Sequence, residues 1–167
     1  MKHYIFLALL LLSSLGATAQ THFNAKGLAD TFLDEDGEEV TFSTILEENK
    51  GQSVLIDIWA SWCKDCIVGL PKLNELLEAY PDINLVCISL DKTEEKWHAG
   101  IEKYYENQGQ HFFAPKGWKS DLFTTIELDW IPRYMLLDKT GKITVFKAIK
   151  ADDKNLINQL RKQENEK

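Results

Sequence analysis

The chain has 167 residues, of which 44% are hydrophobic, and a formal net charge of −7. Its 19 Lys and Arg against 26 Asp and Glu leave no dense basic face for a phosphate backbone, so no nucleic acid partner is expected. The length fits one domain with one hydrophobic core.

The first 19 residues are typical of a secretory signal peptide. Lys2 precedes an apolar run over 4–12, and small residues occupy 17–19. The run is too short to span a bilayer of about 30 Å, which needs about 20 residues. We therefore expect cleavage before Gln20, no retained membrane anchor, and a periplasmic or otherwise extracytoplasmic location.

The next elements alternate between extended and helical patterns. A hairpin with an acidic, Gly-containing turn is predicted over 31–41, and Ser43 can cap a short helix through Glu48. Residues 54–59 form a nearly continuous apolar run, which predicts a central strand covered on both faces. Asp57 is the exception inside that strand.

Helical spacing follows. A helix is predicted to begin at the cysteine pair and end near Tyr80, because apolar residues recur at intervals of three and four: Ile67, Leu70, Leu73, Leu76 and Leu77. A second apolar strand covers 83–90, and a helix opened by Thr93 reaches Tyr105. The polar stretch 107–118, which contains Gly and Pro, predicts a loop.

The C-terminal part predicts a short helix, two strands and a final helix. Ser120 can cap a helix that ends around Ile126. A strand over 134–137 and another over 143–146 are joined by a tight turn, so they should pair antiparallel. The terminal amphipathic helix should fray from Arg161 onward.

The three cysteines are spaced for chemistry rather than for stapling. Cys63 and Cys66 stand one helical turn apart at a predicted helix start, where backbone N–H groups and the helix dipole favour a thiolate. Cys63 is therefore the expected nucleophile and Cys66 the resolving thiol. Cys87, in an apolar strand, is expected to be a small core residue.

A structural disulfide or half of a zinc site is the alternative for this pair. Structural zinc needs four ligands, usually from a second close pair. The remaining donors, Cys87, His98 and His111, fit no such spacing, and both histidines are expected to be solvated. We expect neither metal nor cofactor.

The order of these elements, with the CxxC motif opening the first long helix, resembles the thioredoxin fold. The segment 57–66, DIWASWCKDC, is similar to the thioredoxin signature, and Pro71 also matches. The preceding hairpin and the Leu90-Asp91 strand end are closer to the exported TlpA/ResA-like branch. The resemblance implies an α/β thioredoxin fold, a central mixed sheet flanked by helices with an N-terminal β-hairpin extension, over residues 20–167 with a core of about 52–160.

The resemblance also implies roles for the residues around the cysteines. Asp57 would exchange a proton with Cys66, the alternative being a carboxylate paired with a nearby Lys. Pro132 would be cis and present the backbone of Ile131 to a substrate, the alternative being an ordinary loop proline.

Further positions concern the surface around the pair and its redox tuning. Trp62, with Trp59, would flank the site as an apolar surface for the substrate, whereas Trp97 and Trp118 are expected in the core or packed under loops. Lys64 and Asp65 replace Gly-Pro and would tune the redox potential. Arg133 stands where a small polar residue is common, and both departures leave the redox potential and the choice of partner open.

The function implied is disulfide exchange with protein thiols or disulfides, with the chain acting as a reductant. An unidentified membrane or periplasmic electron donor would restore the dithiol. Two alternatives stay open: a thiol peroxidase of the peroxiredoxin group, and a redox-inactive thioredoxin-fold module that binds a partner between Trp62 and Pro132.

Overall fold

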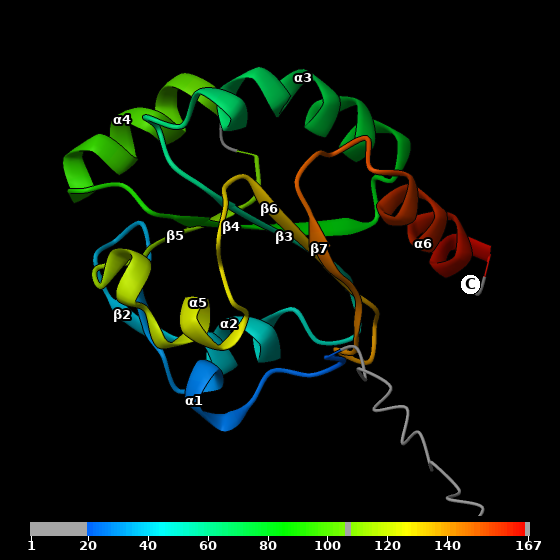
Figure 1. Ribbon diagram of the computed structural model, residues 1–167, viewed down its shortest axis with the longest axis horizontal. Coiled ribbons are helices and arrows are strands. Elements are labelled where there is room, and N and C mark those ends of the chain that lie inside the picture. Colours follow the sequence, from blue (N-terminus) through cyan, green and yellow to red (C-terminus); the bar gives the residue numbers. More distant parts are fainter. Residues whose placement is uncertain (1–19, 106–107, 166–167) are drawn as a thin grey trace, which may run out of the picture.

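The computed structural model describes residues 20–105 and 108–165; the predicted signal peptide lies outside them. Their strands form one seven-stranded sheet of order β2-β1-β5-β4-β3-β6-β7 (Figure 1). β3 pairs parallel with β4 and antiparallel with β6, which confirms the predicted mixed sheet. The strands are β1 (Thr31–Leu33), β2 (Glu39–Thr41), β3 (Ser53–Trp59), β4 (Ile83–Ser89), β5 (Gln110–Phe113), β6 (Arg133–Leu137) and β7 (Ile143–Ala148).

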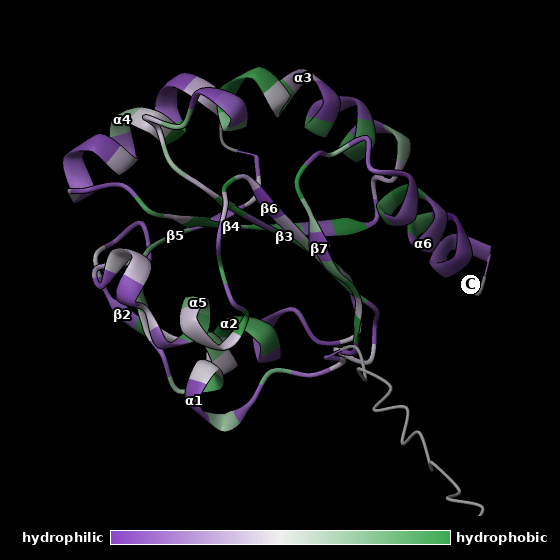
Figure 2. Ribbon diagram, in the orientation of Figure 1, coloured by the Kyte–Doolittle hydropathy of each residue, from purple (hydrophilic) through white to green (hydrophobic). Residues whose placement is uncertain are grey.

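Helices cover both faces of the sheet. Figure 1 shows α3 (Lys64–Ala79), α4 (Glu94–Tyr104) and α6 (Lys154–Asn165) on one face. The short helices α1 (Ala25–Leu28), α2 (Phe42–Glu48) and α5 (Asp121–Thr125) lie on the other. Every residue of β3 is buried, which is why its sequence lacks polar alternation. In Figure 2 apolar colour follows the strands, while the helices show polar colour outward. Within the described residues, no helix is both long and apolar enough to cross a membrane.

The predicted hairpin is confirmed at the sheet edge. β1 and β2 pair antiparallel with Phe32 opposite Val40. The turn is held by the Asp34 carboxylate, which accepts hydrogen bonds from two backbone N–H groups, and by Gly37 at φ +82°. The cap of α2 differs from the prediction, because the Thr41 hydroxyl, and not Ser43, accepts the N–H of Thr44.

The predicted loop over 107–118 is wrong at residues 110–113, which form a strand. This strand, β5, pairs with β4 along its whole length and with β1 at Phe113, so pairing within the sheet stabilises it although it is short. His111 lies opposite Cys87 and is 2% exposed, so the expected solvation of His111 is also wrong; His98 is exposed, as expected.

The terminal helix is longer than predicted. α6 continues to Asn165 instead of fraying from Arg161. Leu156 and Leu160 are buried under it, and the Gln163 side chain donates to the Thr144 hydroxyl on β7 at 3.0 Å. Burial of these two leucines and the hydrogen bond to Thr144 hold the charged C-terminal part of α6 against β7.

Candidate active site

Cys63 and Cys66 are joined where β3 ends and α3 begins. Cys63 is the N-cap of α3, and the Cys66 N–H donates to its Sγ at 3.1 Å. The two sulfurs form a disulfide with Cα atoms 5.3 Å apart, and only 6% of Cys63 is exposed. Cys87 is a free thiol in the core, as expected, and burial raises its pKa well above the ordinary value. The site therefore holds one reactive pair.

The loop before β6 lies against this pair. The Ile131-Pro132 peptide bond is cis, as predicted. The Ile131 carbonyl oxygen lies 3.6 Å from the Sγ of Cys63. Segments 68 residues apart in the sequence thus meet at the sulfur.

Arg133 anchors that loop from inside the protein. Its side chain is fully buried, and its two terminal nitrogens donate to the Ile126 carbonyl at 3.3 Å and to the Asp129 carboxylate at 2.5 Å. Lys147 makes a second ion pair with Asp129. The guanidinium therefore fixes the shape of the loop from the protein interior.

Asp57 is a buried acid that, within the described residues, has a single hydrogen-bonding partner. It is 1% exposed, and its Oδ2 accepts the hydroxyl of Tyr105 at 2.8 Å; no Lys pairs with it among the described residues. Its Oδ1 has no partner there. Burial raises the pKa of Asp57 to about 7, and the Tyr105 hydrogen bond acts in the opposite direction. The carboxyl can therefore gain and lose a proton near neutral pH.

Asp91 supports the segment that carries the cysteines. Its buried carboxylate accepts the backbone N–H of Ser61 at 3.0 Å, the Ser61 hydroxyl at 2.6 Å and the Ser89 hydroxyl at 2.8 Å. Ser61 lies two residues before Cys63. In the sequence, Asp91 is visible as a carboxylate directly after an apolar strand. Its hydrogen-bonding partner, the backbone of Ser61, becomes apparent only in the fold.

The α4 helix approaches the same segment at Gly100. A Cβ there would lie 2.9 Å from the Ser61 Cβ and 3.0 Å from the Trp59 ring. Gly69 in α3 offers a contrast, since its nearest neighbour would be the Tyr134 hydroxyl at 3.8 Å.

We expect Gly100→Ala to destabilise the protein and disturb the site. Overpacking costs about 1–3 kcal/mol, against about 1 kcal/mol of helix propensity gained. Urea unfolding should show a net loss, and disulfide exchange should slow. Gly69→Ala is the matched control and should be neutral or stabilising; equal stability of the two variants would contradict the close approach.

Three exposed tryptophans surround the disulfide. Trp62, Trp118 and Trp130 are 51%, 47% and 53% exposed. They line a cavity of about 400 Å³ together with Cys63, Lys64, Asp65, Asp129 and Ile131. The prediction for Trp62 fits this place, whereas Trp59 is fully buried with its ring 4.5 Å from that of Tyr105. Trp118 was expected in the core or under loops, but it is exposed at this cavity. Trp130 was not predicted as a site residue, because it belongs to no sequence motif.

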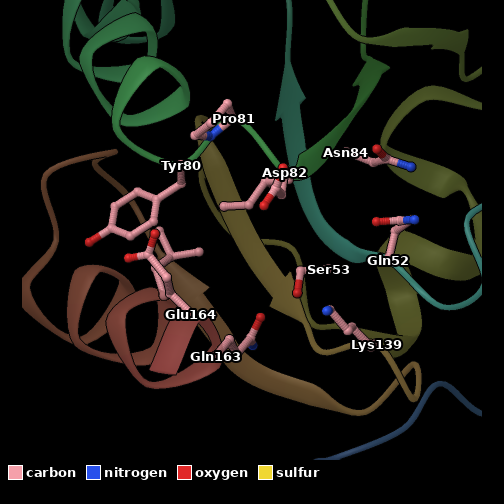
Figure 3. Close-up of a pocket in the computed structure, with 11 residues that line it drawn as sticks. Gln52, Ser53, Tyr80, Pro81, Asp82, Asn84, Lys139, Gln163 and Glu164 are labelled. Carbon is pink, nitrogen blue, oxygen red and sulfur yellow. The ribbon is translucent and has the colours of Figure 1, made fainter. Parts of the chain in front are cut away.

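Another cavity lies away from the disulfide. Figure 3 shows it between the end of α3, the start of β3 and α6, with Tyr80, Ser53 and Glu164 on its walls. Its volume is about 550 Å³ and no cysteine lines it. Within the described residues, no group of His, Cys, Asp or Glu side chains is arranged to hold a metal ion.

The sequence is similar to those of known thiol-disulfide oxidoreductases. A family model described as thioredoxin-like matches residues 51–143. The thiol-disulfide oxidoreductase ResA of Geobacillus thermodenitrificans is 28% identical over 144 residues, covering 81% of this chain and 79% of that protein. The ResA of Bacillus thuringiensis (strain Al Hakam) is also 28% identical, over 98 residues, and this chain spans just 56% of its length.

Solved structures show the same fold. The thioredoxin domain of a thiol-disulfide oxidoreductase from Bacteroides vulgatus matches with a TM-score of 0.64 and 26% identity, over 84% of this chain and 98% of that one. A thiol-disulfide oxidoreductase from Bacteroides fragilis matches with a TM-score of 0.65 and 25% identity, over 82% and 98%. Since the family model covers more than half of the sequence and the fold agrees, the chain belongs to the thioredoxin-like family.

Proposed function

We propose that the chain is an exported thiol-disulfide oxidoreductase that exchanges disulfides with protein substrates and works as a reductant outside the cytoplasm. The observation that carries this proposal is the Cys63–Cys66 disulfide at the start of α3, with the Ile131 carbonyl beside its outer sulfur. The names of the ResA relatives support the same activity.

In the reducing direction, the Cys63 thiolate attacks one sulfur of a substrate disulfide. A bond forms between Cys63 and that sulfur, and the other substrate sulfur leaves as a thiolate that takes up a proton. The α3 N-terminus stabilises the attacking anion, because the Cys66 N–H donates to the Cys63 sulfur and the positive end of the helix dipole lies there.

Cys66 then resolves the mixed disulfide. Asp57 accepts the proton of Cys66, and the resulting thiolate attacks the Cys63 sulfur. The protein disulfide forms, the bond from Cys63 to the substrate breaks, and the second substrate sulfur leaves as a thiolate that takes up a proton. Two electrons have passed from the protein dithiol to the substrate. A membrane or periplasmic dithiol donor returns them, and the leader over 1–19 takes the chain to that compartment.

Stoichiometric exchange tests the proposal. We expect the reduced protein to reduce a disulfide-bonded protein and to form its own disulfide in equal amount, and we expect Cys63→Ser to be inactive because a hydroxyl does not replace the thiolate. Thiol release and mass spectrometry measure both sides. Cys87→Ser is the matched control and should stay active, since Cys87 is buried.

The alternatives give different results in the same assays. A thiol peroxidase would consume hydrogen peroxide in preference to protein disulfides. A binding module would retain substrate affinity in Cys63→Ser/Cys66→Ser while the parent protein exchanged nothing. Either result would overturn the proposed function.

A further inference from the structure

A wide groove adjoins the active-site cavity on the side of α4. Its volume is about 790 Å³, and Trp62 and Trp118 line both this groove and the cavity at Cys63. The close approach of α4 at Gly100, which also lines the groove, places the helix beside the segment that carries the cysteines. A chain seated at Cys63 can therefore continue into the groove past two exposed indole rings.

The charge of the groove is opposite to that of the protein. Three exposed lysines line it, Lys92, Lys96 and Lys103, and among the described residues no carboxylate does, although the chain carries a net charge of −7. The groove is not lined by the acidic residues of α4, which are Glu94, Glu95 and Glu102.

The lysines are available to a ligand. Within residues 20–105 and 108–165, no ion pair joins Lys92, Lys96 or Lys103 to a carboxylate. The ammonium of Lys103 lies 5.0 Å from the centre of the Tyr104 ring, which also lines the groove. Like charges gathered on one wall favour an anionic ligand.

The cavity at Cys63 itself is not basic. Lys64 and Asp65 balance each other on its walls, and Asp129 is engaged by Arg133 and Lys147. Selection by charge therefore has to come from the neighbouring groove.

We propose that the lysine groove (Lys92, Lys96 and Lys103) binds acidic side chains that flank the reacting cysteine of an extended polypeptide substrate. This inference deepens the function proposed above. An extended chain advances about 3.3–3.6 Å per residue, so acidic residues a few positions from the cysteine can reach the groove while the cysteine contacts Cys63. The tryptophans hold the intervening backbone and apolar side chains.

Matched peptides test the inference. Each carries one disulfide, with Asp at these flanking positions in one peptide and Asn in the other, and kcat/KM for reduction is measured at low and high salt. We expect the wild-type protein to prefer the Asp peptide by about fivefold to tenfold at low salt, from three exposed charge contacts. At about 1 M salt, where the screening length falls to about 3 Å, the preference should largely vanish.

Lys92→Gln/Lys96→Gln/Lys103→Gln should bring the Asp-to-Asn ratio close to one. The control removes three exposed lysines at the other end of the sheet, Lys50→Gln/Lys139→Gln/Lys142→Gln, so it changes the net charge equally and should keep the preference. Equal loss of preference in both triple variants would overturn the groove as its source, since net charge alone would then explain it.

Binding separates this inference from the proposed function. Peptides with Ser in place of both cysteines are titrated against the wild-type protein by tryptophan fluorescence. Preferential binding of the Asp form without any exchange would support the groove and overturn the oxidoreductase function. Exchange of both disulfide peptides at one rate, with equal binding, would support the function and overturn the groove.

Discussion

Cys66→Ser should turn the protein into a trap that stays covalently attached to its substrates through Cys63. The resolving thiol lies one helical turn from the nucleophile, and groups held in this way act at effective concentrations of about 10⁵–10⁸ M. External thiols at about millimolar concentration cannot replace it, so release should slow by several orders of magnitude. Adducts should appear on non-reducing gels and disappear on reduction.

Two controls assign the adduct to the right sulfur. Cys63→Ser/Cys66→Ser should form none, and Cys66→Ser/Cys87→Ser should trap as well as the single variant, because Cys87 is buried. Peptide mapping that finds substrate on Cys87, or a Cys66→Ser protein that releases product at the wild-type rate, would contradict the two-cysteine mechanism. The trapped proteins also give the substrates and the direction of electron flow.

Asp57→Asn should stabilise the disulfide form above neutral pH. The unfolded chain releases this proton near pH 3.8, whereas the folded protein keeps it until about pH 7. Because the folded state binds more protons in that window, its unfolding free energy falls as the pH rises through it, by about 4 kcal/mol. Asn does not titrate, so the variant loses this pH dependence. Its gain in unfolding free energy over the wild type should be fully present above about pH 7 and absent below about pH 4.

Urea unfolding of the oxidised proteins from pH 4 to 9 measures this effect, since Cys66 does not titrate in the disulfide. Tyr105→Phe is the companion variant: it removes the hydrogen bond that lowers the pKa of Asp57, so the pH-dependent fall should extend to higher pH. In exchange assays Asp57→Asn should slow resolution and flatten its pH profile. Identical stability profiles of wild type and Asp57→Asn would refute the raised pKa.

The elements that the sequence predicts well are those with long apolar signals. β3 and α3 carry continuous or helical periodicity, and packing enforces both. β5 was missed because four residues in a polar context show no periodicity, and the strand exists through its pairing with β4 and β1. The four-residue α1 was missed for the same reason.

At the site, the sequence identifies the reactive atoms but not their supports. Cys63 and Cys66 follow from motif and spacing, and the cis Pro132 follows from the resemblance to the thioredoxin fold. The partners of Asp57 and Asp91 come from distant segments, so only the folded chain places the Tyr105 hydroxyl and the Ser61 backbone beside them. Trp118 and Trp130 likewise meet Trp62 only through the arrangement of loops around the sheet.

The contact of Thr21 with β7 determines how the protein can be immobilised. The Ile143 N–H donates to the Thr21 carbonyl at 2.8 Å, at the first residue of β7. β7 runs antiparallel to β6, which runs antiparallel to β3, so β7 begins at the pole opposite the one where β3 delivers Cys63. A tag, bead or surface linker joined ahead of Gln20 would therefore hold the protein with its disulfide facing outward, open to large folded substrates.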